Sequence, residues 1–205
     1  MQSSSSHRWL SLVLLCSATF MTILDGSIIN VALPTIQHEL GFTIANLQWI
    51  ITGYALTYGG FLLFAGRASD LFGRRRLFLA GVILFSLASL LCGLAPSQLL
   101  LITSRLVQGV GGALLTPSAL ALIVTLFAEG PERNRALGIY GGLSALGAGV
   151  GALLGGLLTS TLGWRWVFFV NVPVGVLVII LTPFLLREST LAQQNRRIDI
   201  GGALL

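Results

Sequence analysis

Long apolar stretches separated by short polar segments make up most of this chain. Six stretches can be drawn, roughly over residues 10–33, 47–65, 77–95, 99–127, 136–162 and 167–186. Each is close to the about 20 residues that a helix needs to cross the hydrocarbon core of a bilayer. A spanning barrel strand would instead alternate apolar and polar residues over about ten positions. The pattern therefore predicts six membrane-spanning helices.

The composition narrows the fold class further. Of the 205 residues, 55% are hydrophobic and 9% are charged, whereas soluble domains carry about 25% charged residues. Cys16 and Cys92 lie in different apolar stretches, and we interpret them as small buried side chains rather than as a disulfide or a metal pair. The predicted fold class is all-α transmembrane, and we expect neither an enzyme nor a metal site.

The basic residues indicate topology rather than a nucleic-acid surface. The formal net charge is +5, and all twelve cations are arginines in short clusters between apolar stretches. A nucleic-acid partner would need them along one exposed face. Nine arginines fall in the connections assigned to the inner side, against Arg165 on the outer side. The positive-inside rule therefore predicts a multi-pass protein of the cytoplasmic (inner) membrane, with both ends of the chain in the cytoplasm.

The same pattern divides the chain into four parts. We expect a cytoplasmic tail over 1–9, a six-helix transmembrane bundle over 10–186, a cytoplasmic linker over 187–200 and the start of a seventh, truncated helix over 201–205. The last apolar residues are too few to cross about 30 Å at 1.5 Å per residue. We therefore expect missing carboxy-terminal helices as partners of this bundle.

A short pattern recurs within the chain. The residues Gly66, Gly73, Arg75 and Phe78 return 90 positions later as Gly156, Gly163, Arg165 and Phe168. The first copy falls on an inner loop and the second on an outer one, which predicts two inverted three-helix repeats, a feature of transporters. Chance is the alternative, because glycine and arginine are common at helix ends.

Asp25 is a carboxylate inside the first apolar stretch. Inserting a charge at the bilayer centre costs about 2.5 to 3.5 kcal/mol, so this side chain must face water, find a partner or be neutral. We predict that Asp25 carries a proton. A structural hydrogen bond between helices is the alternative.

Arg105 is the one basic residue inside a predicted span, and it stays charged at any relevant pH. Counted along the helices, Asp25 and Arg105 lie about 12 and about 9 Å from the outer ends of their spans. The two can therefore meet. The sequence leaves open whether they pair or whether Arg105 bonds backbone carbonyls instead.

The loop over 66–76 contains Gly66, Asp70, Gly73, Arg74 and Arg75. Asp70 can cap helix amides and pair with arginines, while glycines permit a tight turn. We predict an inner gate. The alternative is a topological anchor made of the arginines, with Asp70 as an ordinary cap.

Two features of the later stretches complete the picture. Gly147, Gly151 and Gly155 recur every four residues on one face, with Gly156 beside them, which predicts close approach of another helix, either for packing or as a hinge. The run 164–166 contains Trp, Arg and Trp at a predicted outer end, and we interpret it as part of an interfacial aromatic belt.

Taken together, the segments 24–34, 66–76 and 101–113 resemble the motifs of the major facilitator superfamily, and specifically its drug:proton antiporters with fourteen helices. The first segment includes Asn30 and Pro34, with Ser27 where threonine is usual, and the third includes Gln108 and Gly109. The fifth-helix motif departs from the family pattern, since Ala152 stands where proline is usual.

The resemblance implies a function. In this family the first and fourth helices line a central cavity, the loop over 66–76 helps to close the inner side, and the arginine at the place of Arg105 takes part in proton coupling. It implies proton-driven export of amphipathic small molecules, with no cofactor and the proton gradient as energy source. A carrier of another substrate class, such as a sugar or metabolite, and a non-transporting half-module that needs a partner are the alternatives.

Overall fold

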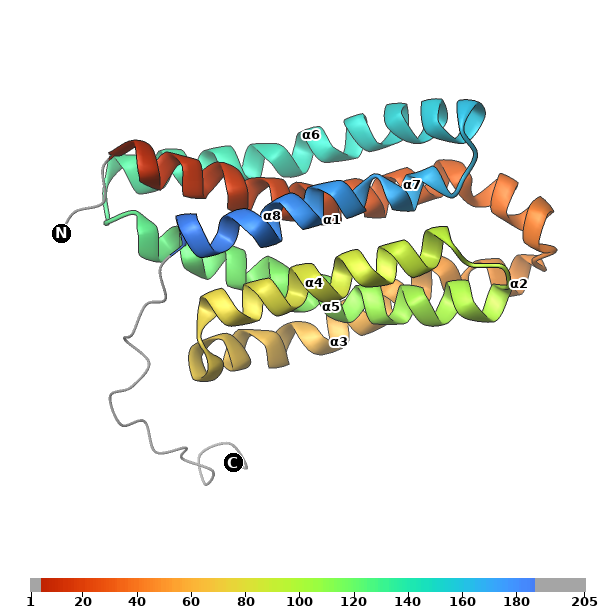
Figure 1. Cartoon of the computed structure of the whole chain (residues 1–205), viewed down its shortest axis with the longest axis horizontal. Helices are drawn as coiled ribbons and strands as arrows, with labels where there is room; N and C mark the ends of the chain where they lie inside the picture. Colours follow the sequence, from red (N-terminus) through yellow and green to blue (C-terminus); the bar gives the residue numbers. More distant parts are fainter. Residues whose placement is uncertain (1–4, 187–205) are drawn as a thin grey trace, which may run out of the picture.

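Figure 1 shows the computed structural model, which describes residues 5–186 except the side chains at 5, 70, 144, 145 and 148. Six long helices follow one another: α1 (Ser5–Leu40), α3 (Trp49–Phe72), α4 (Arg74–Gly93), α5 (Gln98–Leu126), α6 (Pro131–Thr161) and α8 (Asn171–Leu185). Two short helices, α2 (Ile44–Leu47) and α7 (Trp166–Phe169), lie in the connections. The predictions over 187–205 fall outside the described residues.

The long helices coincide with the six predicted apolar stretches, and the all-α fold is confirmed. Within residues 5–186 five helices are long and apolar enough to cross a membrane. In α6 the apolar part found among the described residues, Gly149–Thr161, is shorter. The chain is therefore built as a multi-pass helical membrane protein.

The first helix is longer than its apolar stretch at both ends. It begins at Ser5, inside the predicted tail, and runs on past Pro34 to Leu40. Near its start Arg8 forms an ion pair with Glu132 of α6 at 3.3 Å. Near its end Glu39 pairs with Arg165. Hydropathy alone does not include these polar turns, which tertiary ion pairs hold in the helix.

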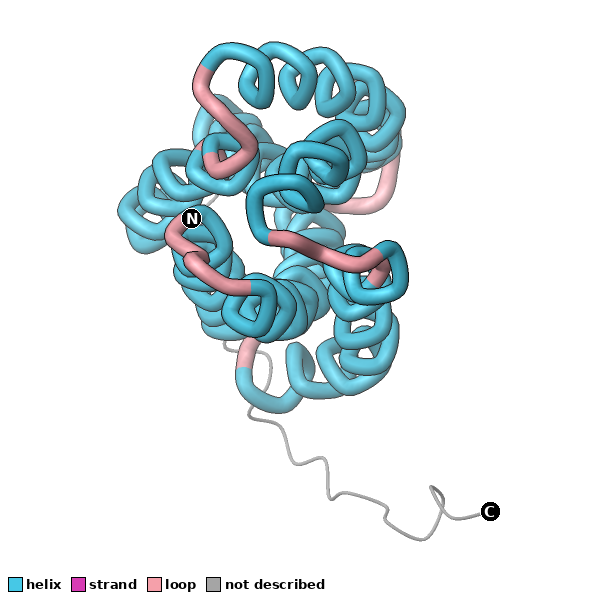
Figure 2. Tube along the Cα trace, turned by 90° about the vertical axis from the view of Figure 1, so that its right-hand side faces the viewer, coloured by secondary structure: helices cyan, strands magenta, loops and turns pink. Residues whose placement is uncertain are grey.

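The helices pack as two interlocked sets of three. In Figure 1, α1 lies along α6, and α3 lies along α5. The first three long helices are α1, α3 and α4, and their counterparts in the second set are α5, α6 and α8. When each helix is replaced by its counterpart, the α1–α6 pair becomes the α5–α3 pair. The same exchange returns the α4–α8 pair to itself. This arrangement fits the predicted inverted repeat, and Figure 2 shows the helices bundled roughly parallel to one another.

The backbone supports the same repeat. Gly73 and Gly163, the matching turn positions, have φ angles of 95° and 93°. Side chains with a Cβ rarely adopt these angles, so each turn requires glycine. Phe78 and Phe168, which follow the two turns, are both fully buried. The motif that recurs in the sequence therefore recurs as structure.

The arginines gather at one end of the bundle. The start of α1, the α3–α4 turn and the α5–α6 connection meet there, at the left in Figure 1. Among the described residues this end carries Arg8, Arg67, Arg74, Arg75, Arg76, Arg133 and Arg135. Arg165 lies at the opposite end. We call the first the arginine-rich end.

The core is divided into two apolar clusters. One, towards the arginine-rich end, includes Met21, Phe85 and Val178, and the other includes Ile28, Leu101 and Phe168. Along four helices the division falls at a polar residue, namely Asp25 on α1, Ser89 on α4, Arg105 on α5 and Asn171 on α8. A polar layer is therefore enclosed between two apolar ones.

Candidate functional site

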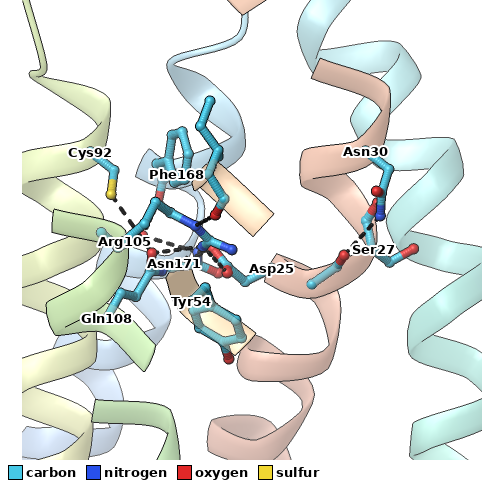
Figure 3. A network of polar contacts seen from close by, with 12 residues as sticks. Asp25, Ser27, Asn30, Tyr54, Cys92, Arg105, Gln108, Phe168 and Asn171 are labelled. Carbon is cyan, nitrogen blue, oxygen red and sulfur yellow. Dashed lines mark hydrogen bonds and ion pairs between the residues drawn. The ribbon is translucent and has the colours of Figure 1, made fainter. Parts of the chain in front are cut away.

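A buried ion pair lies at the centre of this polar layer. Arg105 Nη1 donates to Asp25 Oδ2 at 2.5 Å, and the two side chains are 1% and 0% exposed. Figure 3 shows them pointing toward one another from α5 and α1. Among the described side chains they are the two charged ones that are buried. The sequence placed them at similar depth, and the structure brings them into contact.

The arginine is held on several sides at once. Its Nη1 also donates to Gln108 Oε1 at 2.8 Å, and its Nε donates to the carbonyl of Ile50 at 3.0 Å. The guanidinium carbon lies 4.3 Å from the centre of the Tyr54 ring, a cation–π contact. Both partners that the sequence left open, a carboxylate and a backbone carbonyl, are therefore present.

The second oxygen of the carboxylate has its own donors. Asp25 Oδ1 accepts from Gln108 Nε2 at 2.9 Å and from Asn171 Nδ2 at 3.1 Å. Charge-assisted bonds of this kind are about twice as strong as neutral ones. The site, as it stands, is arranged to hold the ionised carboxylate.

The network reaches two further helices. Asn171 Nδ2 also donates to Ser89 Oγ at 3.0 Å, and Ser89 in turn donates to the carbonyl of Phe168 at 2.9 Å. The thiol of Cys92 donates to Gln108 Oε1 at 3.7 Å. Sequence reasoning did not select Ser89, Asn171 or Tyr54. An amide inside the last apolar stretch was the available signal, because polar groups in a span need partners.

This arrangement is sensitive to the loss of any one member. Each buried ion costs several kcal/mol to desolvate, and only good geometry with extra hydrogen bonds offsets that cost. Removing one partner typically costs about 3–5 kcal/mol, since it leaves an uncompensated buried charge. The packing of several helices around the pair therefore depends on the balance of charge within it.

The predicted loop over 66–76 is a sharp turn between two helices. Gly66 and Asp70 lie within α3, Gly73 makes the turn, and α4 begins at Arg74. Arg74 Nη1 donates to Thr125 Oγ1 at 2.5 Å and to the carbonyl of Ala121 at 3.3 Å, both in the last turns of α5. The loop therefore holds the end of α5.

The turn between α6 and α7 corrects one prediction. Trp164 is 1% exposed and therefore does not belong to an interfacial belt, whereas Trp166 is exposed. The indole Nε1 of Trp164 donates to Glu39 Oε2 at 2.7 Å, and Arg165 pairs with the same carboxylate. Trp164 stands 90 residues after Arg74. Each of the two turns thus holds the end of a helix from the other three-helix set.

The glycine face of α6 packs against α1. A Cβ at Gly147 would lie 2.6 Å from Ile23, one at Gly151 2.6 Å from Ser27, and one at Gly155 3.0 Å from Ile28. A Cβ at Gly156 would meet nothing within 4 Å. Close packing against α1, rather than a break in the helix, is the local result, since α6 runs uninterrupted through Ala152.

The remaining motif positions divide between two locations. Asn30 is exposed and bonds the carbonyls of Gly26 and Ser27 at 3.0 and 3.4 Å, away from Asp25, as Figure 3 shows. Pro34 lies further along α1 and is exposed. Gly109 instead belongs to the α3–α5 contact, where a Cβ would lie 2.1 Å from Thr57 Oγ1.

Comparison with known proteins places this chain among longer ones. Puromycin resistance protein pur8 of Streptomyces alboniger is 47% identical over 204 residues, which cover 100% of this chain and 40% of that protein. The cephamycin export protein CmcT of Amycolatopsis lactamdurans is 45% identical over 204 residues, or 99% of this chain and 42% of that protein. The chain thus spans about two fifths of the length of these relatives.

The fold also has a solved counterpart. The crystal structure of a bacterial homolog to the human lysosomal transporter Spinster, in an inward-facing and unoccupied conformation, matches with a TM-score of 0.74. Its sequence identity is 24%, and the match covers 95% of this chain and 46% of that one. The family model described as Major Facilitator Superfamily matches residues 15–199. This chain therefore belongs to the Major Facilitator Superfamily of membrane transporters.

Proposed function

We propose that this chain is the amino-terminal half of a longer exporter that exchanges protons for amphipathic small molecules. In this proposal the exporter resides in the cytoplasmic membrane with the arginine-rich end inside. The observation that carries the proposal is the buried Asp25–Arg105 pair, because it places one titratable group and one permanent charge at the middle of an apolar bundle.

The coupling step follows from the chemistry of the pair. An ionised Asp25 neutralises Arg105, whereas a protonated Asp25 leaves the guanidinium as an uncompensated cation in a low-dielectric layer. The two protonation states therefore favour different arrangements of the helices around the pair. A conformation that admits water to Asp25 on one side of the membrane exchanges its proton there, and so links transport to the gradient.

The substrate class is supported by the relatives. Their names refer to puromycin resistance and to cephamycin export. These are two chemically different antibiotics, which favours a cavity that accepts amphipathic molecules over one specialised for a single metabolite. Such cavities are lined mostly by apolar and aromatic side chains with a few polar groups.

The test uses the complete transporter in inverted membrane vesicles, with ethidium as a cationic amphipathic probe. Asp25→Asn should lose ethidium accumulation driven by a proton gradient while keeping exchange down an ethidium gradient. Arg105→Lys keeps the charge but loses the planar fork, and should slow accumulation about tenfold, as expected from loss of one charge-assisted bond.

The matched control is Thr182→Val. Thr182 is buried on α8, and its hydroxyl donates to the carbonyl of Val178 on the same helix at 2.7 Å. This variant should transport normally. Accumulation by Asp25→Asn with unchanged proton dependence would place the proton carrier elsewhere. Proton-driven ethidium movement in the opposite direction would favour an importer.

A further inference from the structure

Asn171 lies at the first turn of α8 and bonds Asp25 Oδ1, whereas Arg105 bonds Asp25 Oδ2. Its side chain is fully buried, and its Nδ2 donates both to Asp25 Oδ1 and to Ser89 Oγ. Figure 3 shows it within the network beside Gln108 and Arg105. Both protons of the amide nitrogen are therefore used.

The oxygen of the same amide is in the opposite situation. Asn171 Oδ1 is buried and has no hydrogen-bond partner among the described residues. Buried side-chain acceptors normally have a partner, so an unpaired one within a satisfied network calls for an explanation. This unpaired oxygen belongs to a residue whose amide nitrogen already donates to Asp25.

Protonation of Asp25 creates a need that this atom can meet. A neutral carboxyl group is a donor as well as an acceptor, so its new O–H requires an acceptor nearby. Among the described residues, the groups that hydrogen-bond the carboxylate present N–H donors: Arg105, Gln108 and the Asn171 amide nitrogen. The oxygen of Gln108 already accepts from Arg105 and Cys92.

We propose that Asn171 is a positioning residue that serves both protonation states of Asp25. In the ionised state its Nδ2 donates to Asp25 Oδ1. In the protonated state the amide turns by half a rotation, and Asn171 Oδ1 accepts the new O–H. An asparagine amide presents a donor and an acceptor of nearly the same shape, so this exchange needs little space. The inference rests on the proposed role of Asp25 in proton coupling.

The step balances in atoms and charge. One proton from water forms an O–H bond at Asp25 Oδ1, the carboxylate loses its charge, and no covalent bond breaks in the protein. The bond from Asn171 Nδ2 to Asp25 is replaced by one from Asp25 to Asn171 Oδ1. The hydroxyl of Ser89 exchanges its bond to the Phe168 carbonyl for one to Asn171 Oδ1, because a hydroxyl both donates and accepts. The two Nδ2 protons of Asn171 turn to the place where Oδ1 now lies.

The groups around Asp25 leave this role to Asn171. Three helices present titratable or charged groups to Asp25. These are the permanent charge of Arg105 on α5, the phenol ring of Tyr54 on α3 and the thiol of Cys92 on α4. On the α6 side α1 meets glycines at this level, and the Phe168 ring of α7 lies against Arg105. The α8 partner is uncharged and bears the unpaired oxygen.

Infrared difference spectra of the complete transporter in lipid vesicles test the proposal, with the pH changed and with asparagine labelled by carbon-13. Protonation of Asp25 should give a carboxylic-acid band that Asp25→Asn lacks. A labelled asparagine C=O band should shift to lower frequency in the same pH range, as an unpaired oxygen gains a donor. Asn171→Leu, which keeps the shape of the side chain, should lack that shift.

Two further variants make the result decisive. Thr182→Val should retain the shift, since that hydroxyl bonds its own helix. Ser89→Ala leaves Asn171 in place and should alter its band, which keeps the test available if Asn171→Leu does not fold. A carboxylic-acid band with an unshifted asparagine band would overturn the inference alone, whereas absence of any Asp25 band would overturn the proposed proton coupling as well.

Discussion

Replacement of Arg105 by methionine should destabilise the protein strongly, and should do so most at high pH. The change keeps much of the side-chain volume but leaves Asp25, which is 0% exposed, without its cation. Breaking a buried pair by removing one partner costs about 3–5 kcal/mol. The carbonyl of Ile50, in the first turn of α3, also loses the additional bond that it accepts from Arg105 Nε, a loss that this range includes.

The magnitude should depend on proton concentration. A buried carboxyl without a cation is tolerated best in its neutral form, so protonation of Asp25 relieves part of the cost. Below the pH at which the variant takes up this proton, each further pH unit should reduce the loss of unfolding free energy by about 1.4 kcal/mol. Lowering the pH should therefore recover stability in Arg105→Met but not in the unchanged protein over the same range.

Thermal unfolding of the complete transporter in detergent micelles, followed between neutral and mildly acidic pH, measures this. The double variant Asp25→Asn with Arg105→Met removes both charges and should regain most of the lost stability, because a buried pair replaced as a whole is often nearly neutral. If Arg105→Met unfolds at the temperature of the unchanged protein at neutral pH, the pair is not desolvated and the reasoning above is wrong.

Three further outcomes are expected. A cysteine at position 75 should react with a membrane-impermeant thiol reagent from the cytoplasmic side, and one at the exposed position 166 from the outside; the reverse pattern would invert the topology. Gly109→Ala should overpack the α3–α5 contact, which lowers the free energy of unfolding by about 1–3 kcal/mol and so lowers the unfolding temperature. Gly156→Ala should leave the unfolding temperature unchanged, because its Cβ meets nothing within 4 Å. Asp70→Asn should abolish ethidium export at normal membrane levels, and unchanged export would leave this loop a topological anchor.

The parts of this fold that depend on one helix at a time were accessible from the sequence. The length of an apolar stretch is a property of the segment itself, so the helices were found where hydropathy placed them. Depth along a helix is equally local, which is why Asp25 and Arg105 were expected at one level. Glycine at 73 and 163 has a backbone reason that also acts locally.

The parts that depend on direction around the helix axis were not accessible. Asn171 bonds Asp25 across 146 positions of sequence, and a stretch apolar on all sides carries no periodicity that shows which face meets which neighbour. Trp164 was assigned to the interface from its place at the end of an apolar stretch. Its partner, Glu39, lies 125 residues earlier and could not be identified from the local sequence. Tertiary partners decide such cases, and composition does not identify them.

The two turns also have a mechanical consequence. Arg74 fastens the end of α5 at the arginine-rich end, and Trp164 fastens the end of α1 at the other. The helices that carry the two charges of the central pair are thus held at opposite ends of the bundle. The three-helix set that contains α1 holds α5, and the set that contains α5 holds α1. Bending either helix alone would pull out a clamp and shear the ion pair. We therefore expect α1 and α5 to move together, so that this half of the transporter tilts as a rigid body when the side open to water changes.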